Sequence, residues 1–583
     1  MMRVPGTSRG ATLLLALASV AVAFAAADTY VVVLALPDMM GTARIPINDL
    51  QRAAPIISGF LLGYVAILPL MGRIADLRGR VPVLVMALAV FAVGSLITAV
   101  AYDLPSMVTG RFLQGVGGGG LVPATLALVA DIYPTERRGI PLGIVSGVQE
   151  LGSVVGPLFG AVVLAVASWQ FIFVINLVVG VVLALAIRAA AGRDAMDSPQ
   201  GPVPRGFPDP IGILALLVAI GAATIVLVRP DGMLKDLTWG QLFIPYFGDN
   251  RWVTPIGAVA IGALAVLVVR CLFARRPLVD LRAWFGHLRE ADLLGATYLA
   301  VALGGVILAF ATADPEVQVF SDQGPWFLLG SAVATVAFVV HTRRADQPLI
   351  PHGAIAERPA WGSLAVSFFI GAALIAALID IPIFARTTIY RDSQLDAALV
   401  LVRFLVALPV GAVIGGYLIR RFSSGLVTAV GMFAAAGGFA LMAQWDEDAL
   451  RHWSVTGTLL LTGFGFGLAL APVNAALLAS TRDAVHGVAS ALVVVARMVG
   501  MLVGISALTT LGMREFYDAN RECLAEHASQ YGRCGTQAAI AQEHAVFLGA
   551  AGCAVIAALL ALWLFRGART RGMSAAEVLR SGG

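Results

Sequence analysis

Residues 72–80 read GRIADLRGR, a short polar segment between two long apolar runs. Its glycines, Gly72 and Gly79, allow a tight turn and a close approach of neighbouring helices. Asp76 and Arg80 stand four residues apart, which brings their opposite charges within reach of each other. The segment therefore predicts a conformational latch, in which this charge pair holds one helix bundle against another.

Composition places the rest of the chain in a membrane. Of its 583 residues, 59% are apolar and 13% are charged, and the mean hydropathy is +0.87. Soluble domains contain about 45–50% apolar and about 25% charged residues. Apolar stretches of about 20 residues, the length that crosses the hydrocarbon core, recur along almost the whole chain. We therefore predict an all-α fold, a polytopic transmembrane helix bundle.

The apolar stretches predict sixteen membrane spans, with fourteen as the fallback count. They lie near 11–37, 54–71, 81–101, 106–130, 139–165, 169–191, 210–229, 255–273, 292–312, 327–341, 362–385, 396–418, 425–443, 454–479, 486–511 and 544–565. We divide the chain into an N-terminal six-helix bundle (1–195), central linker helices in two pairs (196–360) and a C-terminal six-helix bundle (361–583). Similar Arg-Arg, Pro-Leu and Trp patterns at 275–284 and 343–361 indicate either a duplicated pair or a chance similarity of two basic loops.

Loop charges predict the orientation of the chain. Arginines cluster in alternate loops, for example at 73–80, 137–138 and 420–421, whereas loops such as 446–448 are acidic. Because positive loops face the cytoplasm, we expect both termini there, in a multi-pass protein of the cell (inner) membrane. The apolar run at 11–37 is too long for a cleaved signal peptide. The net charge of +4 has no basic stripe behind it, so we expect no nucleic-acid partner.

Several function classes find no support in the sequence. The four cysteines form no C-x-x-C pair, and the seven histidines lie in loops or at helix ends, so we expect neither a metal site nor a cofactor. An integral-membrane acyltransferase or a receptor would need an intramembrane His, a Ser–His pair or a large sensory domain. We therefore do not expect an enzyme. Cys523 and Cys534 fall in a predicted outer loop at 512–543, where a disulfide is permitted but not required.

Ionisable residues inside the apolar spans are the sharpest functional signal; they are Asp28, Glu150, Asp380, Arg403 and Arg497. Each costs about 2.5–3.5 kcal/mol at a helix centre and must be paired, protonated or solvated. Glu150 and Arg497 carry opposite charges, one in each half, and either couple proton movement across a cavity or form a permanent salt bridge. Asp380 and Arg403, towards the outer ends of their spans, either have a functional role or simply pair with each other.

Two further spans carry informative residues. Arg111 begins the run RFLQGVGGGG (111–120), and it either takes part in proton coupling or extends to the membrane surface near the outer end of its helix. In the fifth span Gly152, Gly156 and Gly160 form a face of small residues that favours close helix contact. Pro157 removes one backbone hydrogen bond there and permits a bend.

These motifs resemble the signatures of the major facilitator superfamily. Residues 72–80 match its cytoplasmic loop signature at Gly, Asp, Gly and Arg, and depart at Val81, where the family usually has a second basic residue. Residues 111–120 resemble its fourth-helix signature, and 150–160 resemble the fifth-helix motif of its antiporter branches. The resemblance implies two six-helix halves that expose a central cavity alternately to the two sides of the membrane.

Three segments extend the resemblance to the fourteen-helix drug:proton antiporters, and within them to mycobacterial transporters that export triacylglycerides. They are DTYVVV at 28–33, QELGSV at 149–154 and VVVARM at 493–498. The resemblance implies a proton-coupled exporter of lipids, or alternatively a multidrug efflux pump for small amphiphilic compounds. It implies that Asp28, like Glu150 and Arg497, couples protons, and that a periplasmic lipoprotein carrier is a partner. The chain departs from these relatives in carrying two central helix pairs, and we expect it to be a monomer.

Overall fold

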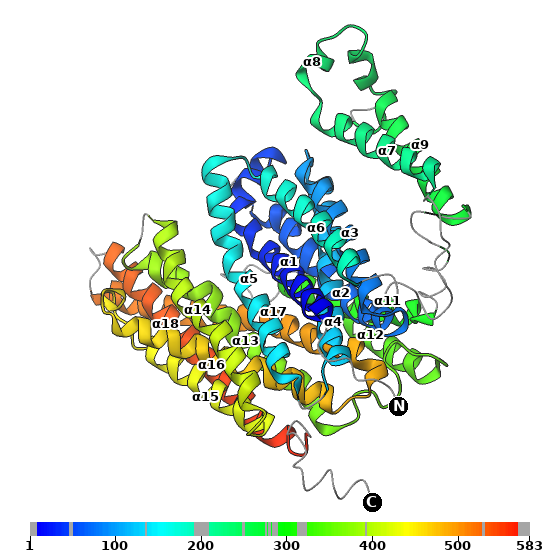
Figure 1. The fold of residues 1–583 in the computed structure, drawn as a ribbon. Helices are drawn as coiled ribbons and strands as arrows, with labels where there is room; N and C mark the ends of the chain where they lie inside the picture. The colour runs from blue at the N-terminus through cyan, green and yellow to red at the C-terminus, as the bar shows by residue number, and fades with distance from the viewer. Residues whose placement is uncertain are drawn as a thin grey trace, which may run out of the picture.

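The computed structural model describes residues 9–568, except for 46–49, 135–136, 192–208, 248–250, most of 275–289, 312–322, 391–392 and 527–530. All regular secondary structure in these residues is helical (Figure 1). Thirteen of the helices are long and apolar enough to cross a membrane, and three further apolar helices are shorter within the described residues. Every predicted span coincides with a helix, so the predicted all-α membrane bundle is confirmed.

Six helices build the N-terminal half. They are α1 (Arg9–Thr42), α2 (Leu50–Arg78), α3 (Arg80–Ala99), α4 (Leu104–Ile132), α5 (Gly139–Val166) and α6 (Gln170–Ala191). Helix α4 begins at a capping box in which the side chain of Asp103 accepts the backbone N–H of Ser106 at 2.9 Å. This cap satisfies one of the donors that the first turn of a helix leaves free.

Six helices of the C-terminal half repeat the same packing. They are α13 (Arg358–Thr387), α14 (Gln394–Leu418), α15 (Ser424–Met442), α16 (Ser454–Ala479), α17 (His486–Glu526) and α18 (Tyr531–Leu564). Helix α1 packs on α5 as α13 packs on α17, α2 on α4 as α14 on α16, and α3 on α6 as α15 on α18. The halves meet where α5 lies along α14 and α2 along α17.

Two helix pairs connect the halves. The first contains α7 (Pro210–Val228), α8 (Asp231–Leu234), the 3-10 turn η2 (Gly240–Phe243) and α9 (Pro255–Phe273); the second contains α11 (Leu293–Ala311) and α12 (Gly324–Arg344). Helix α11 packs on α2 and α17, whereas α7 and α9 pack on each other and stand beside the bundle (Figure 1). Two short 3-10 turns, η3 (Ala449–Arg451) and η4 (Asp483–Val485), lie in loops of the C-terminal half.

Both pairs are closed at the same end by the side chain of an aspartate. Asp209, directly before α7, accepts two hydrogen bonds from Arg270 near the end of α9, at 2.7 and 2.5 Å. Asp292, directly before α11, contacts His341 near the end of α12 at 2.7 Å. Arg270 and His341 each stand three residues before the end of their helix. The matching positions favour the duplication, which stays a prediction.

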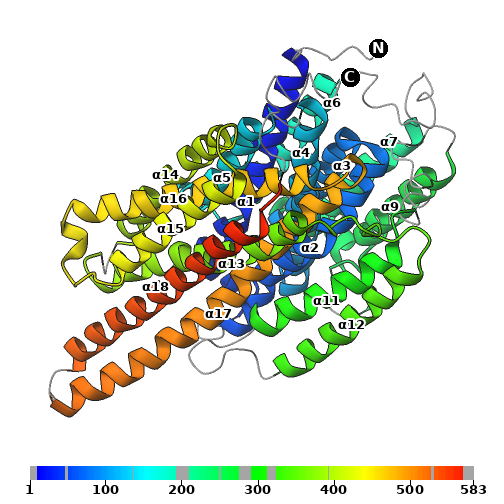
Figure 2. The same cartoon turned by 90° about the horizontal axis from the view of Figure 1, so that it is seen from below.

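Helices α17 and α18 are too long for the membrane alone. The 41 residues of α17 correspond to about 60 Å at 1.5 Å per residue, about twice the hydrocarbon thickness. Figure 2 shows the two helices running side by side beyond the other helices. The predicted outer loop at 512–543 is therefore wrong for its described residues, which continue both helices. Cys523 and Cys534 form a disulfide between them, with Cα atoms 5.5 Å apart.

Close packing of α1 on α5 depends on the small-residue face predicted in the fifth span. A Cβ atom at Gly152 would overlap the carbonyl group of Ala23, and one at Gly156 would overlap that of Ala27. Gly160 continues the same helix, and the side chain of Pro157 lies outside the described residues. The two glycines thus fix the backbone of α1 immediately before Asp28.

We expect Gly156→Ala to lower the melting temperature of the purified protein, because the new methyl group would push α1 away from α5. Overpacking of this kind costs about 1–3 kcal/mol. Gly221→Ala in α7 is the matched control, since nothing lies within 4 Å of its Cβ position and Ala favours a helix over Gly. Equal melting temperatures for the two variants would contradict this account of the α1–α5 contact.

Candidate functional site

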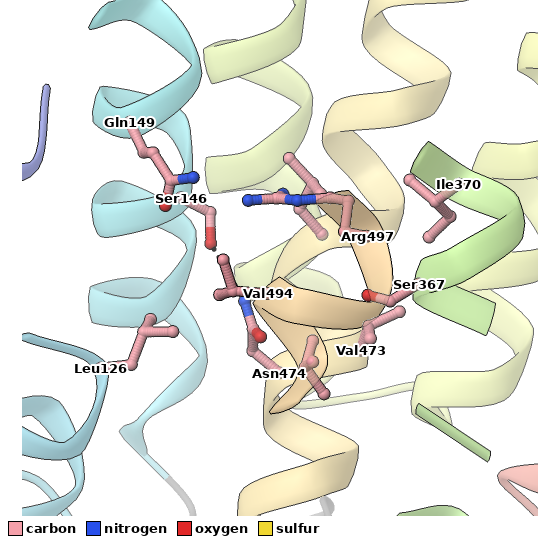
Figure 3. A pocket seen from close by; sticks show the side chains of 11 residues that line it. Leu126, Ser146, Gln149, Ser367, Ile370, Val473, Asn474, Val494 and Arg497 are labelled. Carbon is pink, nitrogen blue, oxygen red and sulfur yellow. Dashed lines mark hydrogen bonds between the residues drawn. The ribbon is translucent and has the colours of Figure 1, made fainter. Parts of the chain in front are cut away.

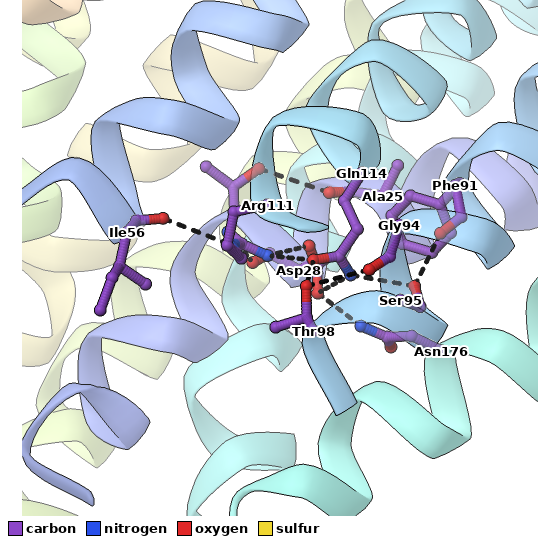
Figure 4. Close-up of polar contacts among 11 residues, drawn as sticks. Ala25, Asp28, Ile56, Phe91, Gly94, Ser95, Thr98, Arg111, Gln114 and Asn176 are labelled. Atoms are coloured by element: carbon purple, nitrogen blue, oxygen red, sulfur yellow. Dashed lines mark hydrogen bonds and ion pairs between the residues drawn. The ribbon is translucent and has the colours of Figure 1, made fainter. Parts of the chain in front are cut away.

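A buried ion pair joins α1 to α4. Asp28 is 2% exposed and Arg111 is fully buried. Nη1 of Arg111 donates to Oδ2 of Asp28 at 2.5 Å, and Nη2 donates to the backbone carbonyl of Asp28 at 3.3 Å. Figure 4 shows both side chains pointing into the space between their helices. Because neither charge reaches water, each depends on the other for its stabilisation.

Amide side chains complete the surroundings of the Asp28 carboxylate. Asn176 on α6 donates to Oδ1, and Nε2 of Gln114 on α4 lies 3.5 Å from the same oxygen. Gln114 also donates to Ser95 Oγ on α3 at 2.9 Å, and its Oε1 accepts from Thr98 at 3.2 Å. The network ties α3, α4 and α6 to one carboxylate of α1 (Figure 4).

Aromatic rings cover the Arg111 guanidinium. Its central carbon lies 4.4 Å from the ring centre of Phe60 on α2 and 5.9 Å from that of Phe173 on α6. Nε donates to the Ile56 carbonyl at 3.4 Å. The alternative in which Arg111 extends to the membrane surface is therefore wrong. Cation–π contacts and the Asp28 carboxylate hold the guanidinium inside the half.

The network includes polar residues that the sequence did not single out. A criterion based on ionisable residues inside apolar spans does not detect Asn176, Gln114 and Ser95. The available signal was a lone Asn in the otherwise apolar run QFIFVINLVVG at 170–180. A carboxamide costs free energy in hydrocarbon unless it finds a hydrogen-bond partner, so Asn176 and Asp28 could have been expected to meet.

A cavity lies between the two halves, and Arg497 of α17 lines it. The other polar lining residues are Ser146 and Gln149 of α5, Ser367 of α13 and Asn474 of α16, as Figure 3 shows. Nδ2 of Asn474 donates to Ser146 Oγ at 3.3 Å, which links the halves directly. Glu150 follows Gln149 in α5, but its side chain lies outside the described residues, so its pairing with Arg497 stays a prediction.

The segment 72–80 binds the C-terminal half. The Asp76 carboxylate accepts the backbone N–H groups of Gly487 at 2.9 Å and Val488 at 3.1 Å, at the start of α17. Its own neighbour Arg80 lies 3.1 Å away. A carboxylate at a helix N-terminus is stabilised by the unpaired N–H groups and by the helix dipole. The bond between the halves is thus made by Asp76 and backbone amides rather than by the charge pair alone.

The glycines and the arginine of this segment support the contact. A Cβ at Gly72 would lie 2.5 Å from the Gly487 carbonyl oxygen, so only glycine permits the approach of α2 to α17. Gly79 has φ 91°, in the left-handed region that favours glycine. Arg80 also reaches Asp131 at the end of α4, at 3.1 Å. Arg80 therefore anchors Asp76 within the N-terminal half.

Asp380 and Arg403 do not pair with each other. Arg403 donates to Thr456 Oγ1 at 3.2 Å. Asp380 lies near the carboxyl group of Glu543 on α18, a residue that was not among the sequence-based candidates. Glu543 directly precedes the predicted span at 544–565, whereas α18 begins at Tyr531 and includes it. Within the described residues no cluster of three or more metal-ligating side chains occurs.

Comparisons with known proteins decide the family. The profile described as Major Facilitator Superfamily matches residues 18–505. The chain belongs to this superfamily. The triacylglyceride transporter of Mycolicibacterium hassiacum is 33% identical, over 96% of this chain and 92% of that relative. The triacylglyceride transporter of Mycobacteroides abscessus is 34% identical, over 88% of this chain and 85% of its own length.

Solved structures of superfamily members share the fold. The human organic anion transporter MFSD10 gives a TM-score of 0.54 at 12% identity, covering 94% of this chain and 99% of its own. The proton:xylose symporter XylE gives 0.51 at 12% identity, covering 98% of both chains. Together with the names of the relatives, the family identifies a transporter rather than an enzyme, in a multi-pass membrane protein.

We expect Asp28→Asn and Arg111→Gln each to destabilise the transporter by about 3–5 kcal/mol, because each leaves a buried partner without its counter-charge. The double variant should lose less than the sum of the two, since it leaves no unpaired charge. The melting temperatures of the parent protein, the two single variants and the double variant, measured in one detergent, complete this double-mutant cycle. Asp38→Asn, an exposed carboxylate on the same helix, is the control. Strict additivity would contradict a direct interaction of the pair.

We expect Asp76→Asn to separate the halves at the end that carries residues 72–80, because an amide oxygen can accept one of the two backbone N–H groups but its NH₂ repels the other. Spin labels at Arg137→Cys and Arg421→Cys, exposed positions on opposite halves at that end, report the separation. The distance distribution should shift to longer values than in the parent protein. An unchanged distribution would show that Asp76 does not hold this end closed.

Proposed function

We propose that this transporter is a proton-coupled antiporter that exports hydrophobic molecules, with triacylglycerides as the expected substrates. The observation that carries proton coupling is the Asp28–Arg111 pair. It places a carboxylate, the group that exchanges protons, at the junction of four helices of one half. The substrate class rests on the relatives, which are named triacylglyceride transporters and match most of the chain.

Protonation of Asp28 would change the packing of its half. A neutral carboxyl group no longer compensates the Arg111 guanidinium, which is held between two aromatic rings and has no route to water in this state. The helices must then shift until Arg111 finds water or another acceptor. Such a shift gives protonated and deprotonated forms different preferences for the two states of the transporter, which is the requirement for coupling.

The conformation supports alternating access. Asp76 holds α17 against α2, and Gly143 of α5 packs on the Ala412 backbone of α14 at the same end. With the arginine-rich loops in the cytoplasm, this end is the cytoplasmic side of the inner membrane and both termini lie there. The closed contact then corresponds to a state that faces outward, ready to release substrate. A periplasmic lipoprotein carrier would receive a lipid on that side, from a monomeric transporter.

Reconstitution into liposomes with an imposed pH gradient tests the proposal. We expect gradient-driven movement of labelled triacylglyceride in the parent protein. Asp28→Asn should keep exchange of labelled for unlabelled substrate but lose accumulation driven by the gradient, because only the coupled step needs the proton. Asp38→Asn on the same helix is the matched control.

Each result has a defined meaning. Ethidium transport without triacylglyceride transport would replace the lipid exporter by a multidrug efflux pump. Normal gradient-driven accumulation in a folded Asp28→Asn variant, judged by its elution volume, would remove Asp28 from proton coupling. Loss of exchange as well as accumulation would assign Asp28 a structural role only.

A further inference from the structure

Two buried carboxyl groups meet between α13 and α18. Asp380 is 6% exposed and Glu543 is 1% exposed. Helices α13 and α18 pack along each other, and the two carboxyl groups lie close enough to interact. Neither group belongs to the cavity that Arg497 lines, and neither takes part in the network around Asp28.

The burial of two neighbouring carboxyl groups favours a bound proton. An ionised carboxylate is only an acceptor, so two ionised groups cannot form a hydrogen bond with each other. Oε2 of Glu543 is buried and has no hydrogen-bond donor among the described groups. One proton on the pair would supply the missing donor and would remove the repulsion of two negative charges outside bulk water.

Buried aromatic side chains lie one helical turn from each carboxyl group. Phe384 lies one helical turn after Asp380, and Phe547 one turn after Glu543, so each ring shares a helix face with its carboxyl group. Both rings are fully buried and pack on Trp445, with ring centres 5.3 and 6.0 Å from it. Because Oε2 of Glu543 is itself buried, solvent does not supply the missing donor.

No described cation neutralises either carboxyl group. Helices α15 and α16 carry no charged residue. Arg403 of α14 donates to Thr456, and the Nε2 of His544 on α18 lies 2.6 Å from the Trp445 carbonyl. Arg386 of α13 and Arg514 of α17 are exposed, and Arg497 lines the central cavity.

We propose that Asp380 and Glu543 form a second proton-binding site, in the C-terminal half and outside the central cavity, which holds one shared proton while α13 and α18 are in contact. Loss of that proton would leave two adjacent negative charges and would drive the two helices apart. Helix α13 also packs on α17, where Gly371 touches the backbone of Arg497. The site is therefore connected to the helix that lines the cavity. The inference does not depend on the substrate or on the coupling role of Asp28.

The dependence of stability on pH tests the site. The native pair binds one proton more than the unfolded chain, in which both carboxyl groups are ionised above about pH 5. Stability must therefore fall as pH rises. We expect the melting temperature of the parent protein to fall between about pH 5 and about pH 9, and Glu543→Gln, which carries its own donor, to show a distinctly flatter dependence. We expect the melting temperature of Asp380→Asn to depend equally weakly on pH.

A spectroscopic measurement makes the test independent of folding stability. The infrared C=O stretch of a protonated carboxyl group should be present at neutral pH in the parent protein and reduced in Glu543→Gln. Asp396→Asn, an exposed carboxylate of the same half, should leave both the band and the pH dependence unchanged. An unchanged band together with an unchanged pH dependence in Glu543→Gln would overturn the shared proton. If Na⁺ stabilises the protein at constant pH and the infrared band is absent, the pair binds a metal cation instead of a proton. That result would also overturn the proposal.

Discussion

The N-terminal half depends on one fully desolvated carboxylate. Asp28 satisfies its charge through Arg111 and its remaining lone pairs through amide side chains, so α1, α3, α4 and α6 all converge on it. Close contact of α1 with α5 is possible because Gly152 and Gly156 lack side chains. The ion pair and hydrogen bonds of Asp28 and the close contact at Gly152 and Gly156 thus position the same segment of α1. A change at either point would be felt at the other, because both act on a single turn of helix.

The two halves share a helix arrangement but differ in how they treat buried charge. In the N-terminal half a carboxylate is paired with a guanidinium. In the C-terminal half a carboxyl group is paired with a second carboxyl group. The first arrangement is stable when Asp28 is ionised, whereas the second needs a bound proton. Symmetry of the backbone has therefore been kept while the electrostatic requirements of the two halves have become different.

Much of the fold could be predicted from the sequence, because apolar runs of sufficient length dictate spans without any knowledge of tertiary contacts. The latch was equally accessible, because glycines and opposite charges in a short segment between two spans indicate a turn that brings helices together. The contact partners of the buried side chains could not be predicted from the sequence. For Arg111 the sequence allows either proton coupling or extension to the membrane surface, because it does not show that Phe60 and Phe173 face the guanidinium. The extension of α17 to Glu526 was missed because polar residues end a span without ending a helix.

The α7–α9 hairpin stands beside the bundle (Figure 1) with many of its large apolar side chains exposed, including Leu214, Leu217 and Leu264. A soluble protein could not present such a surface, but acyl chains cover it without cost. Annular lipids and lateral pressure therefore act on its position together with protein contacts such as that of Arg251, whose guanidinium carbon lies 4.0 Å from the ring centre of Tyr102. Bilayer thickness and composition thus become structural variables for this part of the molecule, and a detergent micelle is a different environment for it than a nanodisc.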